Sequence, residues 1–263
     1  MQDHISNNKE EQFKSFQFRY ILTSKIPFSE LSEDIPNIEF IKENNYLIGF
    51  VVTLNKLLSQ SEGEKRINDY ANFISNLISI KSGRYTLPTL TDPQYVRNNG
   101  SKKVRVSKML CMKFDIEGIP AKLDIKNDVL NLYKISPHIQ LHLKYLTKSI
   151  KFYHDHSPEY SIIEAFKIIE NNKKFSDYCK YFGLRNIVVH SPYDTTPNYK
   201  KNTLNSFDIY FNKNDFDYIQ YQRKDNILQL ILLNLESTKT QRKLNEVSIE
   251  LINKIKQHLH IKN

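Results

Sequence analysis

The sequence has no tryptophan and only two cysteines, Cys111 and Cys179, in 263 residues. Neither cysteine lies in a C-x-x-C pair or in a zinc-binding spacing, so we expect free thiols and no disulfide framework. The first eleven residues are polar and lack the apolar stretch of a secretory signal peptide. Together, these absences predict a cytoplasmic protein.

Long apolar runs are also missing. The longest are Tyr46–Val52 and Ile227–Leu233, and both are far shorter than the roughly 18 residues that a membrane-spanning helix needs. We expect both runs to be buried elements of a globular protein, and we expect no membrane partner.

Acidic residues are outnumbered, because 38 Lys and Arg against 29 Asp and Glu give a net charge of +9. A basic surface attracts the phosphates of nucleic acids. The same surplus is equally consistent with a lysine-rich surface that serves only solubility. Charge therefore permits an RNA partner without requiring one.

Residues 1–126 show the patterns of a small α+β domain, to which the sequence assigns no role. Alternating apolar residues predict a strand over 13–22, and β-branched and aromatic residues predict a second strand over 46–54. Prolines and small polar residues predict two loops, one formed by Pro27 with residues 29–36 and one over 85–102, before further strands between 104 and 116.

A helix is expected between these strands. Ser61 and Glu64 have the spacing of a capping box at its start, and Gly83 is suited to the position just after its end. Helical spacing predicts its buried face to be Ile67, Ala71, Ile74, Leu77 and Ile78.

Residues 127–263 show mostly helical patterns and predict an all-α bundle with an inserted hairpin-like segment, which makes the fold class of the whole chain α+β. Ser136-Pro137 and Ser157-Pro158 each place a proline at the first position of a helix. Gly183 is expected to break the third long helix. Helices are expected over 127–135, 138–153, 159–171, 175–190, 225–235 and 241–260, with the hairpin formed by 207–211 and 216–221.

The most informative segment is Arg185-Asn186-Ile187-Val188-Val189-His190, which Ser191-Pro192 follows. Asn186 and His190 are four residues apart and share one face of a helix. The proline disfavours helical geometry at the residue before it, so the helix should end near His190. A helix C-terminus favours a protonated imidazole, which would supply a second cation beside Arg185.

These residue types suit RNA cleavage without a metal ion. The 2′-OH must lose a proton and attack the adjacent phosphorus, while the 5′-oxygen gains a proton as it leaves. His190 can serve as base or acid, and Arg185 can bind phosphate and stabilise the charge that develops on it. Asn186 would orient the histidine or the phosphate. One set of these three residues provides too few groups for the whole reaction, but two sets facing each other across a dimer interface would be sufficient.

The C-terminal half, from about Asp128, resembles a HEPN domain, the helical "higher eukaryotes and prokaryotes nucleotide-binding" fold. In that family an Arg-x4–6-His motif, commonly with Asn directly after the Arg, ends the third main helix. Arg185, Asn186 and His190 match it in that order. The resemblance implies metal-independent RNA cleavage at a composite homodimer site, without a cofactor, as in toxins and antiphage-defence proteins.

Two supporting residues and a protein partner also follow from this resemblance. Glu170 stands where a polar residue often faces the same cleft. Small antitoxin-regulated members carry a His-x-Tyr extension of the motif, whereas Ser191-Pro192 separates Tyr193 from His190 here. An antitoxin or another defence-system protein is the partner that the family implies.

Other basic residues are candidate contacts for the RNA backbone. They are Lys102, Lys103, Arg105 and Lys108 in the first domain and Lys200-Lys201 after the motif. Tyr85 or Tyr95 is near enough in sequence to the first cluster to stack on bases. The simpler interpretation of that cluster is an exposed strand edge, where lysines prevent aggregation.

Two further interpretations stay open. His138 and His142 have an H-x3-H spacing that can hold zinc, but no third ligand is evident, so we expect no metal site. The alternative to an enzyme is a non-catalytic dimerisation module that binds RNA or protein.

Overall fold

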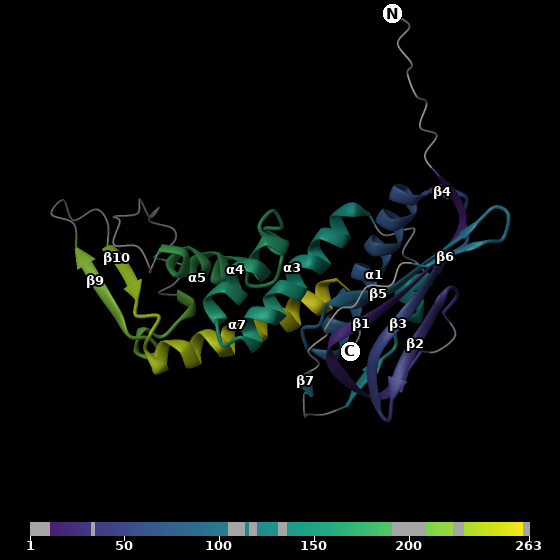
Figure 1. Cartoon of the computed structure of the whole chain (residues 1–263). Coiled ribbons are helices and arrows are strands. Elements are labelled where there is room, and N and C mark those ends of the chain that lie inside the picture. The colour runs from purple at the N-terminus through teal and green to yellow at the C-terminus, as the bar shows by residue number, and fades with distance from the viewer. Residues whose placement is uncertain are drawn as a thin grey trace, which may run out of the picture. The chain divides into compact units, whose positions relative to one another are not determined.

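The computed structural model describes residues 11–32, 35–104, 114–115, 120–130, 136–190, 209–222 and 229–259. These residues form two compact units (Figure 1). The N-terminal unit extends to Ser136, and the C-terminal unit begins at Pro137 and includes residues 83–85. The sequence predicts a division after residue 126, which is the first residue of helix α2 (Lys126–Leu130), and this helix lies in the N-terminal unit.

Strand β1 (Gln12–Leu31) is the centre of the N-terminal sheet. The other strands are β2 (Ile38–Glu43), β3 (Tyr46–Leu54), β4 (Leu58–Ser59), β5 (Pro88–Arg97), β6 (Lys102–Val104), β7 (Phe114–Asp115) and β8 (Ala121–Leu123). The main path runs β2-β3-β1-β5-β6, and β4, β7 and β8 also pair with β1. Pairing with β3 and β5 is antiparallel, whereas β7 and β8 run parallel to β1.

The predicted alternation along β1 is confirmed, because Phe16, Phe18, Tyr20 and Leu22 are buried. The strand continues beyond residue 22 and passes through Pro27, which pairs with β3. The expected loop is therefore wrong for residues 29–31. The chain stays extended there because β8 pairs with this end of β1 and supplies the backbone partners that a loop would lack.

The predicted loop over 85–102 is also wrong, since β5 occupies most of it. Both prolines lie where a missing N–H costs little. Pro88 is the first residue of the strand, and Pro93 lies near a register shift in the pairing of β5 with β1. The local rule fails because β1 supplies a partner that the sequence pattern does not reveal.

Helix α1 (Gln60–Ser82) packs on this sheet, and its five predicted core residues are all buried. Gly83 follows the helix with a φ of 67°, the left-handed conformation expected there. The predicted capping box is wrong. The Ser59 hydroxyl accepts a hydrogen bond from the Glu62 N–H at 3.3 Å, and Glu64 accepts one from the buried Tyr95 hydroxyl at 2.6 Å.

Aromatic rings fill the space between α1 and the sheet. Phe13, Phe16 and Phe18 each lie against Tyr95, with ring centroids 5.3 to 5.9 Å apart. Tyr95 is only 2% exposed, so it is part of the core and cannot stack on an RNA base as the sequence suggested.

The C-terminal unit is not the predicted all-α bundle. It contains helices α3 (Pro137–His154), α4 (Pro158–Ile169), α5 (Tyr178–His190) and α7 (Thr238–His258), the short 3-10 helix η2 (Lys213–Asp215), and strands β9 (Tyr218–Gln222) and β10 (Gln229–Leu233). The expected helix over 225–235 is wrong where it is described, because β10 pairs antiparallel with β9. The hairpin partner of β9 is therefore β10, and not the 207–211 segment.

Local patterns could not decide the conformation of β10. Its sequence, Gln-Leu-Ile-Leu-Leu, is a short apolar run that fits a buried helix or a buried strand equally well. Contact with β9 and α5 decides in favour of the strand, and Leu232 and Leu233 are buried there. The expected break at Gly183 is wrong for a similar reason: α5 runs through this glycine, because packing outweighs its helix cost of about 1 kcal/mol.

The helix starts in this unit are better predicted than its strands. Pro137 and Pro158 are the first residues of α3 and α4, and α7 closely follows the expected 241–260 segment. Among the described residues, no helix is both long and apolar enough to cross a membrane.

Gly63 gives the first testable prediction. A Cβ atom built on Gly63 would lie 2.1 Å from Cζ of Phe16, a fully buried ring. Gly63→Ala should therefore force α1 away from β1 and destabilise the N-terminal unit by about 1–3 kcal/mol. Urea unfolding followed by circular dichroism measures this change. Asn72→Ala, at an exposed position of the same helix, is the matched control and should be nearly neutral; equal stability of the two variants would contradict the close packing.

Candidate functional site

Helix α5 carries the motif found in the sequence. The helix spans Tyr178–His190, so Arg185, Asn186 and His190 all lie in its last two or three turns. The backbone of His190 is described, but its side chain is not. Tyr193, Lys200 and Lys201 lie outside the described residues, as do Arg105 and Lys108 of the basic cluster.

Three groups surround the guanidinium of Arg185. Its Nη1 donates a hydrogen bond to Oδ1 of Asn186 at 2.9 Å, and its Nη2 lies 3.7 Å from Oε1 of Glu170. The group also lies over the ring of Phe166 on α4, with Cζ 5.8 Å from the ring centroid. The structure thus places Glu170, which the sequence indicated only as a supporting residue, beside Arg185 and Asn186 of the motif.

The contact between Arg185 and Glu170 is weak enough to be exchanged. The two side chains are 30% and 50% exposed, and a single nitrogen–oxygen pair at 3.7 Å joins them. Exposed pairs of this kind contribute roughly 0–1 kcal/mol. An incoming anion such as a phosphate could therefore replace the carboxylate beside Arg185 at little cost.

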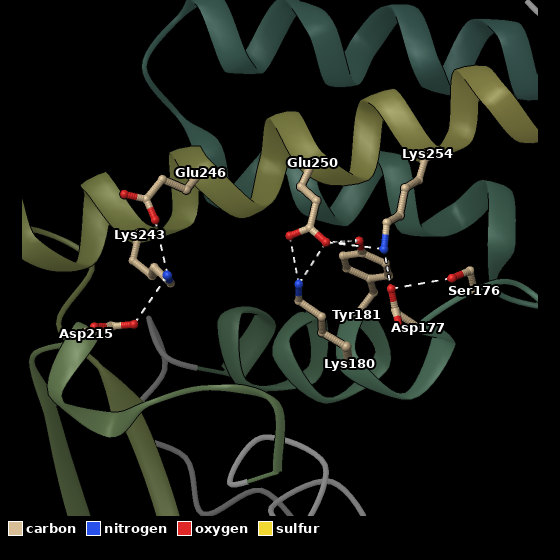
Figure 2. A network of polar contacts seen from close by, with 9 residues as sticks. All are labelled: Ser176, Asp177, Lys180, Tyr181, Asp215, Lys243, Glu246, Glu250 and Lys254. Carbon is tan, nitrogen blue, oxygen red and sulfur yellow. Dashed lines mark hydrogen bonds and ion pairs between the residues drawn. The ribbon is translucent and has the colours of Figure 1, made fainter.

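A row of charged contacts fixes the first turns of α5 against α7 (Figure 2). We call it the polar seam; it comprises Asp177, Lys180, Tyr181, Glu250 and Lys254. The carboxylate of Glu250 accepts hydrogen bonds from Nζ of Lys180 at 2.7 and 2.8 Å and from the Tyr181 hydroxyl at 2.9 Å. Lys254 contacts Glu250 at 3.4 Å and also bonds Asp177.

Tyr181 shows why the polar seam contains a carboxylate. The residue is fully buried, and a buried hydroxyl without a partner costs about 1–3 kcal/mol. Burial raises the pKa of Tyr181, and the neighbouring Glu250 carboxylate raises it further. The hydroxyl therefore stays protonated and donates to Glu250, which fixes the rotation of α5 and hence the direction of Arg185 one turn later.

A smaller group of charged contacts lies nearer the N-terminus of α7. Lys243 lies 3.3 Å from Asp215 of η2 and 3.1 Å from Glu246 of its own helix (Figure 2). Sequence reasoning missed this contact and the polar seam. The regular charges of α7 at 243, 246, 250 and 254 were the available signal, because this three- or four-residue spacing places them on one helix face.

Two lysines of the basic cluster, Lys102 and Lys103, lie on the described strand β6. β6 is the last strand on the main path of the sheet, which agrees with the interpretation of an exposed edge. Lys103 lies 3.4 Å from Glu11, donates to Gln60 at 3.0 Å and sits over the ring of Phe13. Its charge is therefore already engaged within the N-terminal unit, while Lys102 is exposed.

The two histidines of α3 stay together, with ring centroids 4.0 Å apart. Burial lowers the pKa of His142, and the adjacent His138 lowers it further, so His142 favours the neutral form. No group of three or more His, Cys, Asp or Glu side chains suited to a metal ion occurs within the described ranges.

Comparison with known proteins adds no further assignment. No family model, no curated protein and no solved structure matches the chain. The functional interpretation therefore rests on the residues and their geometry.

The polar seam gives a pH-dependent prediction. Burial raises the pKa of Glu250, but hydrogen bonds from Lys180 and Tyr181 outweigh it and leave this pKa below its ordinary value of 4.5. A hydrogen bond from Lys254 likewise lowers the pKa of Asp177. A depressed carboxyl pKa stabilises the fold above the ordinary pKa, and this stabilisation is lost as the pH falls through the folded-state value.

Glu250→Gln should therefore destabilise the protein by about 1 kcal/mol at neutral pH, because Gln keeps an acceptor for Tyr181 but loses the charge that faces the lysines. Urea unfolding at a series of pH values should show the difference from wild type shrinking below about pH 4.5. Glu246→Gln, one turn away and more exposed, should have a smaller effect. A difference that persists or grows in acid would contradict the assigned role.

Proposed function

We propose that the chain is a metal-independent endoribonuclease of the HEPN type that acts as a cytoplasmic homodimer. The observation that carries the proposal is the cluster of Arg185, Asn186 and Glu170, in which the first two residues lie on α5, the helix that continues to His190. The C-terminal unit is not the all-α domain expected from the sequence. The proposed function therefore rests on the motif and on helices α4 and α5.

The proposed reaction is transesterification within RNA. A histidine accepts the proton of the 2′-OH, the 2′-oxygen forms a bond to the adjacent phosphorus, and the bond from phosphorus to the 5′-oxygen breaks. A different group, acting as an acid, delivers a proton to the leaving 5′-oxygen. The products are a 2′,3′-cyclic phosphate and a 5′-hydroxyl, so no water or metal is consumed in this step.

Each motif residue has one role in this scheme. His190 is the base or the acid, because a histidine side chain can gain or lose a proton near neutral pH. Arg185 binds the phosphate and stabilises the charge that builds on its oxygens. Asn186 holds the guanidinium through its amide oxygen, at 2.9 Å, and Glu170 holds it until the phosphate replaces the carboxylate.

A second copy of the chain supplies what one copy lacks. Base and acid act in the same step, and one motif provides one histidine. Two motifs facing each other would provide both, together with two arginines for the phosphate. We further propose that the protein is a toxin or an antiphage-defence effector, controlled by an antitoxin or another protein of the same system, with the N-terminal unit positioning RNA or sensing the trigger.

The first test is RNA cleavage in EDTA. Purified wild type should cut structured RNA, His190→Ala should lose about 10²–10⁴-fold in rate, and Arg185→Ala about 10²–10³-fold, with the fold intact by circular dichroism. His156→Asn is the matched control, because asparagine tolerates the left-handed backbone of this residue, whose φ is 56°. Undiminished cleavage by His190→Ala, or a strict need for a divalent metal, would falsify the mechanism.

The second test concerns the dimer. Adding an excess of inactive His190→Ala to wild type should lower the activity by more than simple dilution does, because a mixed dimer holds only one of the two histidines that the reaction needs. Activity per molecule should also fall on dilution. If added His190→Ala does not inhibit wild type and wild type stays active at every dilution, each chain acts alone. Salt-sensitive RNA binding without any product would instead favour the non-catalytic module.

A further inference from the structure

Two aromatic side chains share a face of α5 with Arg185. Tyr178, Phe182 and Arg185 follow each other at four and three residues, so they lie in one row along the helix. The rings of Tyr178 and Phe182 are stacked, with centroids 5.9 Å apart and an angle of 18° between their planes. Both residues are partly exposed.

A buried ring supports this row from α4. Phe166 is 1% exposed, and its centroid lies 5.7 Å from that of Tyr178 and 6.2 Å from that of Phe182. The Tyr178 hydroxyl donates to the backbone carbonyl of Glu170 at 3.0 Å. Because these contacts already fix the rings, a ligand that stacks on them would lose little affinity to side-chain ordering.

The aromatic row lies close enough to Arg185 for one nucleotide to reach both. Phe182 and Arg185 are three residues apart, or about 4.5 Å along the helix axis. A nucleotide offers an anionic phosphate and a planar base within one unit, and this part of α5 offers a cation and partly exposed rings within one turn. Stacking on aromatic rings tolerates every base, because each base has a π-face.

We propose that Tyr178 and Phe182 form a stacking platform for a nucleobase of single-stranded RNA, next to the phosphate that Arg185 binds. This inference rests on the proposed ribonuclease function and names the part of the substrate that the same site holds. The platform binds without regard to sequence, so it sets the position of the scissile phosphate and does not select a base.

A second aromatic pair in the same unit provides a control. Phe152 of α3 and Tyr160 of α4 lie 5.5 Å apart, and Lys151 sits over the Phe152 ring at 5.4 Å. Tyr160 is 52% exposed and lies ten residues before Glu170, or about 15 Å along a helix. This pair has aromatic rings and a cation but lacks the motif, so it should not contribute to binding.

Binding can be measured without cleavage by using a short single-stranded 2′-O-methyl oligoribonucleotide, which has no free 2′-OH to attack. Fluorescence anisotropy should show that Phe182→Leu weakens binding by roughly five- to tenfold, since one stacked base is lost. Phe182→Tyr keeps a ring and should bind like wild type. Tyr160→Leu, the control, should also leave the affinity unchanged.

Abasic oligonucleotides separate stacking from a structural effect. An abasic residue moved along the strand should weaken binding to wild type at one or two positions, and the same change should cost Phe182→Leu nothing there. If wild type and Phe182→Leu respond equally to every abasic position, or if wild type does not bind the oligonucleotide, the platform is wrong.

The outcome is independent of catalysis. Cleavage of unmodified RNA by wild type is measured in parallel. Normal cleavage with no coupling between base and ring overturns the platform alone. Coupling with no cleavage supports the platform as an RNA-binding surface and overturns the proposed nuclease.

Discussion

The hydroxyl of Tyr181 is buried and must be bonded, and this constraint determines how the motif-bearing helix is held. Its partner is Glu250 on α7, at 2.9 Å. The same carboxylate accepts a hydrogen bond from Lys180 and forms an ion pair with Lys254. Helix α5 therefore meets α7 through charged groups, while its contact with α4 is aromatic, through Phe166. Hydrogen bonds need partners in specific positions, whereas hydrophobic burial is non-directional. We therefore infer that the polar seam fixes the register of α5 and that the apolar side supplies the packing.

What the sequence predicts well is local. The period along β1, the buried face of α1 and the proline starts of α3 and α4 each depend on residues close together in the chain. The failures depend on contacts outside the segment itself. β5 contains two prolines and becomes a strand because β1, far earlier in the chain, pairs with it. β10 is a short apolar run that fits a helix or a strand, and pairing with its neighbour β9 makes it a strand.

Part of the candidate site could also be predicted from local sequence, and part could not. Arg185, Asn186 and His190 form a motif within six residues, and their spacing on a helix can be predicted from the sequence. The sequence does not show which aromatic residues are buried and which are exposed. Tyr95 lies close in sequence to the lysines of β6 yet is part of the core, whereas Phe182, about one turn before Arg185, is partly exposed. Burial decides which ring can meet a ligand, and burial depends on elements far away in the chain.

The weak contact between Arg185 and Glu170 constrains how the proposed site would bind RNA. Replacing one anion beside Arg185 with another changes the free energy by roughly the value of an exposed ion pair, at most about 1 kcal/mol. Arginine alone would therefore hold a phosphate poorly while the carboxylate competes for it. Additional affinity has to come from groups outside this ion pair. The partly exposed rings of Tyr178 and Phe182 are one such source, and a second motif from another copy of the chain is the other. In this arrangement Glu170 keeps Arg185 oriented in the free protein, and the substrate displaces the carboxylate only when base stacking and the second copy add their contributions.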